Sequence, residues 1–167
     1  EDINDYQIYI PFAYNGSPEY FSKIEKEVMN LGLLSNTVFQ RKFMPINDYE
    51  KLLMKSSYFI SAHERQQALG TITLSKLFGN VVFLKKDVKV NGEIVVSPNW
   101  DIVVNQRGFQ AYSLNKLKRS KTVSEFQLPK KELVEQERKL FEERIDEKKS
   151  IEKMLRCINQ IKSELNE

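Results

Sequence analysis

A run of five polar side chains at residues 63–67 is the stretch of this 167-residue chain best suited to chemistry. The run consists of His63, Glu64, Arg65, Gln66 and Gln67. It follows an apolar segment typical of a buried strand, and it precedes a helix-like segment that opens with Gly70 and Thr71. Loops that lead from a strand into a helix are where α/β proteins bind ligands, so we expect a ligand site here.

The start of the helix near Gly70 is expected to attract an anion. Its first N–H groups have no partner within the helix, and the helix dipole is positive at this end. Gly70 would let a ligand approach the backbone, Thr71 would add a hydroxyl, and Arg65 would add a charged fork of donors. A phosphate or pyrophosphate is therefore the natural ligand. Gln66 and Gln67 can each donate and accept, as recognition of a base or sugar requires.

Each of these residues also has a purely structural interpretation. A Gly or Thr at a helix start is usually a cap, Arg65 could simply pair with Glu64 or another surface carboxylate, and a lone histidine is more often a structural hydrogen-bonding group than a catalyst. The sequence contains neither a P-loop nor a G-x-G-x-x-G pattern. His63 and Cys157 lie too far apart to suggest metal-ligand spacing. We expect neither a metal ion nor a cofactor.

Short apolar runs alternate with helical patterns over the first 118 residues. Strands are predicted over 6–12, 36–43, 57–62, 80–86 and 109–113, and helices over 17–32, 46–56, 70–79 and 97–108. This alternation predicts a Rossmann-like α/β fold, with a parallel sheet covered by helices on both faces. Asn91-Gly92, within an alternating segment at 87–96, predicts a β-hairpin inserted before the next helix.

The composition changes beyond residue 128, which divides the chain into an α/β domain at 1–128 and a helical tail at 129–167. The tail carries one apolar stripe, formed by Ile151, Met154, Ile158, Ile161 and Leu165. Such a stripe must be buried, because an isolated helix is marginal in water. We favour a helical hairpin or bent helix packed partly on the α/β domain. Self-association through the tail is the alternative.

Composition limits the class of protein. Hydrophobic residues make up 41% and charged residues 29%, as in globular proteins, and a net charge of +3 is too small to indicate nucleic-acid binding. The single cysteine, Cys157, fits a reducing compartment. A basic cluster at 115–121 could contact anionic lipid headgroups, although a solvated face is the favoured interpretation. We therefore expect a cytoplasmic protein, with at most peripheral contact with the inner face of the membrane.

The segment 58–84, YFISAHERQQALGTITLSKLFGNVVFL, resembles the bacterial TDP-N-acetylfucosamine:lipid II N-acetylfucosaminyltransferases. That family is similar in having an aromatic strand, an Arg-Gln-Gln run, a Gly-Thr pair that opens a helix, and a Gly before the next strand. The resemblance spans roughly residues 6–118. Ala68 stands where the family pattern has glycine, and the 87–96 hairpin and the tail have no counterpart in that pattern.

The resemblance implies a glycosyltransferase of the GT-B architecture, in which two Rossmann-like domains face each other across a cleft. The matched part is the C-terminal, nucleotide-sugar-binding domain. The N-terminal domain would be missing, and with it the catalytic base, so we name no catalytic residue. The implied reaction transfers a deoxyamino sugar or related hexose from a TDP-sugar to a lipid-linked or surface-glycan acceptor, without a metal ion.

The resemblance also implies roles for individual residues. Arg65, Gly70 and Thr71 would bind the donor diphosphate. The donor sugar or nucleoside would contact Tyr14, Asn15, His63, Glu64, Gln66 and Gln67. The alternative function is a non-catalytic Rossmann-like interaction module whose tail recruits a partner or dimerises. Nucleotide binding would separate the two.

Overall fold

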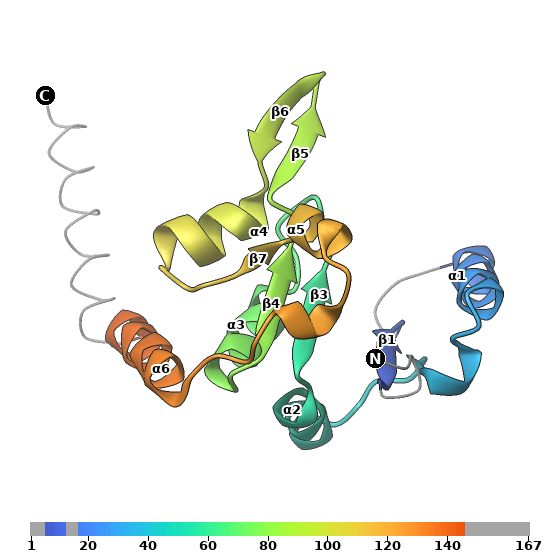
Figure 1. Cartoon of the computed structure of the whole chain (residues 1–167), viewed down its shortest axis with the longest axis horizontal. Coiled ribbons are helices and arrows are strands. Elements are labelled where there is room, and N and C mark those ends of the chain that lie inside the picture. Colours follow the sequence, from blue (N-terminus) through green and yellow to red (C-terminus); the bar gives the residue numbers. More distant parts are fainter. Residues whose placement is uncertain (1–5, 13–16, 146–167) are drawn as a thin grey trace, which may run out of the picture. The chain divides into compact units, whose positions relative to one another are not determined.

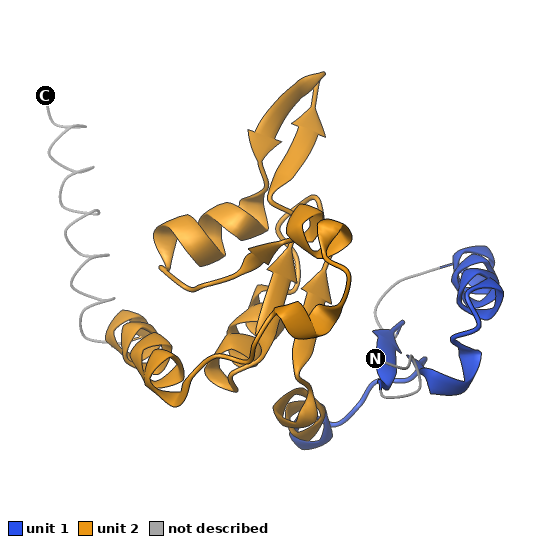
Figure 2. Cartoon of the chain, in the orientation of Figure 1, with its two compact units in different colours: residues 1–49 blue, residues 50–167 orange. Residues whose placement is uncertain are grey.

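The computed structural model describes residues 6–12 and 17–145. The chain is a mixed α/β protein in which parallel strands are flanked by helices, as predicted, and a helix ends the described part (Figure 1). The parallel strands are divided between two sheets, where the sequence indicates a single sheet, and the hairpin is separate from both. The chain divides into two compact units, 1–49 and 50–167, and the boundary lies inside α2 (Ile46–Lys55) (Figure 2).

The N-terminal unit is one β–α–β motif. Strand β1 (Ile8–Pro11) pairs in parallel with β2 (Thr37–Gln40), and α1 (Pro18–Asn30) and the 3-10 turn η2 (Leu34–Asn36) connect them. Ser17 caps α1 by accepting a hydrogen bond from a first-turn N–H group, as its position before a proline predicts.

Aromatic side chains pack together in the N-terminal unit. The ring centroids of Phe12 and Phe21 are 4.9 Å apart, and those of Phe21 and Phe39 are 5.4 Å apart. The guanidinium of Arg41 lies 3.7 Å from the centroid of Phe21 and forms a 3.3 Å ion pair with Glu25. Edge-to-face aromatic contacts and a cation over a ring therefore join α1 to the ends of both strands.

The sheet of the second unit has three parallel strands. Strand β4 (Val81–Leu84) lies in the middle, between β3 (Tyr58–Ser61) and β7 (Tyr112–Ser113). The pairing runs from Tyr58 opposite Val81 to Ser61 opposite Leu84. All four residues of β4 are buried, as expected of a central parallel strand that is covered on both faces.

Helices cover the two faces of this sheet. On one face, Val82 and Leu84 pack in a cluster with residues of α3 (Leu69–Leu77) and of the continuous helix formed by α4 (Pro98–Trp100) and the π-helical η3 (Asp101–Gln106). On the other face, Val81 and Phe83 contact residues of α5 (Leu114–Arg119) and of the 3-10 turn η4 (Val123–Glu125), with Phe126 at the centre. The period-2 alternation of β4 thus supplies both halves of the core.

The predicted hairpin is confirmed and projects from the second unit (Figure 1). Its strands are β5 (Asp87–Val90) and β6 (Glu93–Val96), and they pair in antiparallel. The turn residues have positive φ, 51° at Asn91 and 92° at Gly92, as a two-residue hairpin turn requires. All four residues of β6 are exposed, and three of them are aliphatic.

The helix α6 (Lys131–Ile145) packs on the second unit, so the first part of the predicted tail docks on the α/β body. Its Glu137 forms a 3.2 Å ion pair with Lys76 of α3 and also accepts a 2.9 Å hydrogen bond from the N–H of Gln110. Leu140 and Phe141 contact the cluster that contains Val82 and Leu84. The apolar stripe from Ile151 to Leu165 lies outside the described residues.

The basic cluster at 115–121 belongs largely to α5. The ammonium group of Lys116 lies 4.7 Å from the ring centroid of Tyr112, and Lys118 and Arg119 are exposed. The cluster thus has an exposed side, which fits a solvated face as well as contact with lipid headgroups. None of the helices in residues 6–12 and 17–145 is long and apolar enough to cross a membrane.

Candidate functional site

The polar run lies in a loop, residues 62–68, between the carboxyl end of β3 and the start of α3. The neighbouring strand β4 ends at the same edge, because Ser61 pairs with Leu84. This edge is where open parallel sheets bind their ligands. Residues 62–66 are exposed and Gln67 is half-buried, so the loop forms an open surface.

The helix after the loop begins without a side-chain cap. Its N-cap residue is Ala68, which has no polar side-chain atom, and α3 proper starts at Leu69, one residue before the predicted start. The Ala68 carbonyl accepts the first helical hydrogen bond, 2.9 Å from the N–H of Ile72. An anion at this end would accept hydrogen bonds from the N–H groups of the first helical turn, the role that a capping side chain has at the start of other helices.

Ala68 has a left-handed backbone, with φ 56° and ψ 23°. Such a conformation costs an L-residue about 1–2 kcal/mol, and glycine adopts it without that penalty. The glycine of the family pattern would therefore suit this position. Here the surrounding contacts must hold an alanine in it instead.

Gly70 lies next to open space. Its backbone is not left-handed, and apart from its chain neighbours and the backbone of its own helix no heavy atom lies within 4 Å of the point where a Cβ would stand. Neither conformation nor internal packing therefore requires glycine here. The space leaves the backbone of the first helical turn accessible to a ligand, as the sequence predicts for an anion site.

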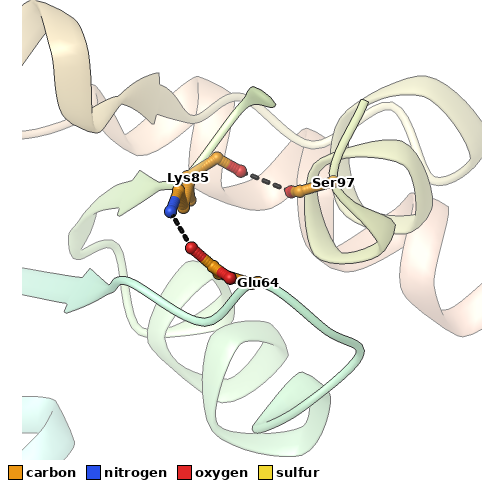
Figure 3. A network of polar contacts seen from close by, with 3 residues as sticks. All are labelled: Glu64, Lys85 and Ser97. Carbon is orange, nitrogen blue, oxygen red and sulfur yellow. Dashed lines mark hydrogen bonds and ion pairs between the residues drawn. The ribbon is translucent and has the colours of Figure 1, made fainter. Parts of the chain in front are cut away.

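Two pairs of contacts fasten the loop to the segment that follows β4. In the first, the carboxylate of Glu64 pairs with the ammonium of Lys85, whose carbonyl accepts a hydrogen bond from the Ser97 hydroxyl (Figure 3). Ser97 is also the N-cap of α4. The Glu64–Lys85 pair is largely exposed, so it is worth at most about 1 kcal/mol.

The second pair of contacts involves the side chain of Asn99 and the backbone of Gln67. The Gln67 N–H donates to Oδ1 of Asn99 at 3.2 Å, and Nδ2 of Asn99 donates to the Gln67 carbonyl at 2.9 Å. Asn99 is only 2% exposed. Both main-chain groups of Gln67 are thus satisfied, and only its side chain remains for a ligand.

Arg65 is exposed and has no hydrogen bond or ion pair within residues 6–12 and 17–145. The structural interpretation, a pair with Glu64 or another surface carboxylate, has no counterpart among the described residues, and Glu64 pairs with Lys85 instead. Gln66 is likewise exposed and without a partner in the part of the chain that the structure describes. Arg65 is therefore a solvated cation shortly before the start of α3, and its guanidinium is available to donate hydrogen bonds to a bound phosphate.

The remaining predicted residues fall into two groups. His63 is exposed, and its Nδ1 lies 2.8 Å from the Ser61 hydroxyl, so the ring is anchored to the end of β3. Thr71 belongs to the first turn of α3 and is half-buried. Tyr14 and Asn15 lie outside the described residues, so their predicted contact with a nucleoside stays a prediction.

Sequence reasoning missed the residues that support the loop. Ser97 was recognisable as a helix cap because Pro98 follows it, and the structure confirms that role. Lys85 and Asn99 carry no such signal, since their partners are 21 and 32 residues away.

The part of the chain that the structure describes has no cluster of three or more His, Cys, Asp or Glu residues suited to a metal ion. An open cavity of about 460 Å³ lies elsewhere, in the N-terminal unit, against the first turns of α1. It is lined by Phe12, Ser17, Pro18, Phe21, Ser22, Glu25 and Arg41.

Comparisons of the chain with protein-family models, curated proteins and solved structures return no match.

Proposed function

We propose that this chain is the donor-binding part of a bacterial glycosyltransferase, and that it binds the diphosphate of a nucleotide sugar, a TDP-sugar in the first instance. The observation that carries the proposal is Arg65, an exposed cation without a partner among the described residues, in the loop that leads into the start of α3, where no side chain caps the helix. The resemblance of 58–84 to TDP-N-acetylfucosamine transferases supplies the reaction class and the donor.

The chemistry required of such a site is charge stabilisation. When the sugar leaves, negative charge develops on the nucleotide diphosphate, and a transferase that uses no metal must offset it with cations and helix N–H groups. In this proposal Arg65 and the backbone at Gly70 and Thr71 serve the diphosphate. Gln66, the side chain of Gln67 and His63 contact sugar or ribose.

The pairing of Glu64 with Lys85 refines its proposed role. Lys85 offsets the charge of the carboxylate, so Glu64 does not repel an anion bound beside Arg65. In this proposal a second, N-terminal GT-B domain would bind the acceptor, lipid-linked or glycan, and would supply the catalytic base. Transfer to a lipid-linked acceptor would take place at the inner face of the cytoplasmic membrane.

Calorimetric titration with dTDP and UDP tests the proposal. Losing a hydrogen bond to a charged group costs about 1.5–3 kcal/mol, so Arg65→Ala should weaken nucleoside diphosphate binding about ten- to a hundredfold. Its melting temperature should stay unchanged, because Arg65 is exposed and forms no pair with any residue that the structure describes. Arg119→Ala is the matched control, since it removes the same charge from an exposed position on α5.

Two outcomes would count against the proposal. Equal affinities of wild type and Arg65→Ala would remove Arg65 from the site. Equal losses of nucleoside diphosphate affinity in Arg65→Ala and Arg119→Ala would mean that the loss reflects the change in net charge and not a contact made by Arg65.

One observation favours a second function, that of a non-catalytic interaction module. The β5–β6 hairpin exposes aliphatic side chains, with Ile94 at 79% exposed and Val96 at 46%. An exposed apolar patch on a projecting element is typical of a protein-binding surface. Failure of both dTDP and UDP to bind the wild-type chain would favour this function over donor binding.

A further inference from the structure

We propose that Asn99 is a positioning residue for the anion site: it holds loop 62–68 in the shape that presents the start of α3 to a phosphate. The inference rests on the proposed function and goes beyond it, because Asn99 lies outside the segment 58–84 and the resemblance assigns it no role. Its partner is 32 residues away along the chain.

The geometry of the contact is that of a clamp. A single side-chain amide donates to the carbonyl and accepts from the N–H of one residue, Gln67, at 2.9 and 3.2 Å. Two bonds from one rigid planar group restrain both peptide planes that flank that residue. Asn99 is itself buried and belongs to α4, whose start is capped by Ser97. The clamp is therefore anchored to the body of the second unit.

The residue next to the clamp explains why the loop needs one. Ala68 follows Gln67 directly and has the left-handed backbone that alanine disfavours. If the clamp were released, the chain at Ala68 would relax toward an ordinary conformation, and the first turn of α3 would change direction. The N–H of Gln67 is also committed to Asn99, so it is not available as a backbone donor to a phosphate.

The experiment compares Asn99→Ala with Asn80→Ala. Asn80 is a matched control because it is also a buried asparagine, 1% exposed, whose amide donates to a distant carbonyl, that of Leu53 at 3.0 Å. It precedes β4, at the opposite end of that strand from the loop. Both variants should lose stability, and only Asn99→Ala should weaken dTDP binding, by about tenfold.

A rescue separates positioning from general damage. Ala68→Gly should restore most of the lost affinity in the Asn99→Ala background, because glycine adopts the left-handed conformation without help. Ala68→Gly should change the wild-type affinity little. Asn99→Asp keeps the shape of the side chain and its acceptor but loses the donor. It replaces Asn99→Ala in the binding comparison if Asn99→Ala does not fold.

Amide hydrogen exchange supplies a readout that does not require a ligand. The Gln67 amide should exchange at least about tenfold faster in Asn99→Ala than in Asn80→Ala once both are corrected for stability. Equal affinity losses in the two asparagine variants, or no rescue by Ala68→Gly, would overturn the inference. If wild type binds neither dTDP nor phosphate, the proposed function fails. Unchanged Gln67 exchange would then overturn the clamp as well.

Discussion

The buried ion pair between α3 and α6 gives the sharpest test of how this protein is held together. Lys76 and Glu137 are 3.2 Å apart, and their side chains are only 3% and 1% exposed. The same oxygen of Glu137 accepts from the Gln110 N–H at 2.9 Å, and the other oxygen has no partner within the described part of the chain. Glu137→Leu removes the carboxylate and leaves both donors in place.

The expected loss is large because the partner cannot reach water. Removing one member of a buried pair leaves an uncompensated charge, which typically costs about 3–5 kcal/mol. The N–H of Gln110 would lose its acceptor at the same time. A domain of this size is stable by only about 5–15 kcal/mol, so Glu137→Leu should remove a large part of the stability of the second unit.

Urea denaturation followed by tryptophan fluorescence measures this loss. Trp100 is the only tryptophan, and it packs against the core of the second unit, so its emission reports on that unit. Glu135→Ala is the matched control on the same helix. Glu135 pairs with Arg138 at 2.9 Å, but the two side chains are 50% and 45% exposed, so the control should lose less than about 1 kcal/mol.

A double variant separates charge burial from shape. Lys76→Met combined with Glu137→Leu removes both charges and keeps an apolar contact, and such replacements are often neutral or stabilising. It should recover most of the stability lost in Glu137→Leu. A loss in Glu137→Leu no larger than in Glu135→Ala would refute the buried pair, and so would a double variant as unstable as the single one.

Three further predictions concern the same helices and the proposed site. Burial lowers the pKa of Lys76 from its usual 10.5, and Glu137 only partly opposes this. Between the lowered pKa and 10.5 the unfolded chain binds more protons at Lys76 than the folded chain does. The free energy of unfolding of wild type, measured in urea, should therefore rise with pH relative to that of Lys76→Met. A difference between the two proteins that does not change with pH would contradict the lowered pKa. Ending the chain after residue 128 removes Leu140 and Phe141 from the core and should lower the urea midpoint; sedimentation of both chains at several concentrations would detect a dimer if the tail self-associates instead. The 167-residue chain should bind nucleotide in the calorimetric titration but should not consume the sugar donor in a transfer assay. Measured turnover would show that no further domain is needed.

Local features of the fold were predictable from the sequence. The serine of each Ser-Pro pair caps a helix, Gly32, Gly79 and Gly108 all have positive φ where helices were predicted to end, and Asn91-Gly92 forms the hairpin turn. These features depend on contacts within a few residues, or on the conformational freedom of glycine itself, so the local sequence is enough to specify them. The position of loop 62–68 between a strand and a helix followed from the same signals.

Only the tertiary structure decided how the elements assemble and what holds the loop. The alternating pattern is the same whether five strands form one sheet or two, because side-chain periodicity reports burial and not the identity of the neighbouring strand. Glu137 is one of many charged residues in its helix, and its burial depends on Lys76, 61 positions earlier in the chain. Asn99 and Lys85 likewise act through partners that no local pattern connects to them. A polar contact between distant residues leaves no periodic trace in the sequence, so the support of the site emerges only when the chain is folded.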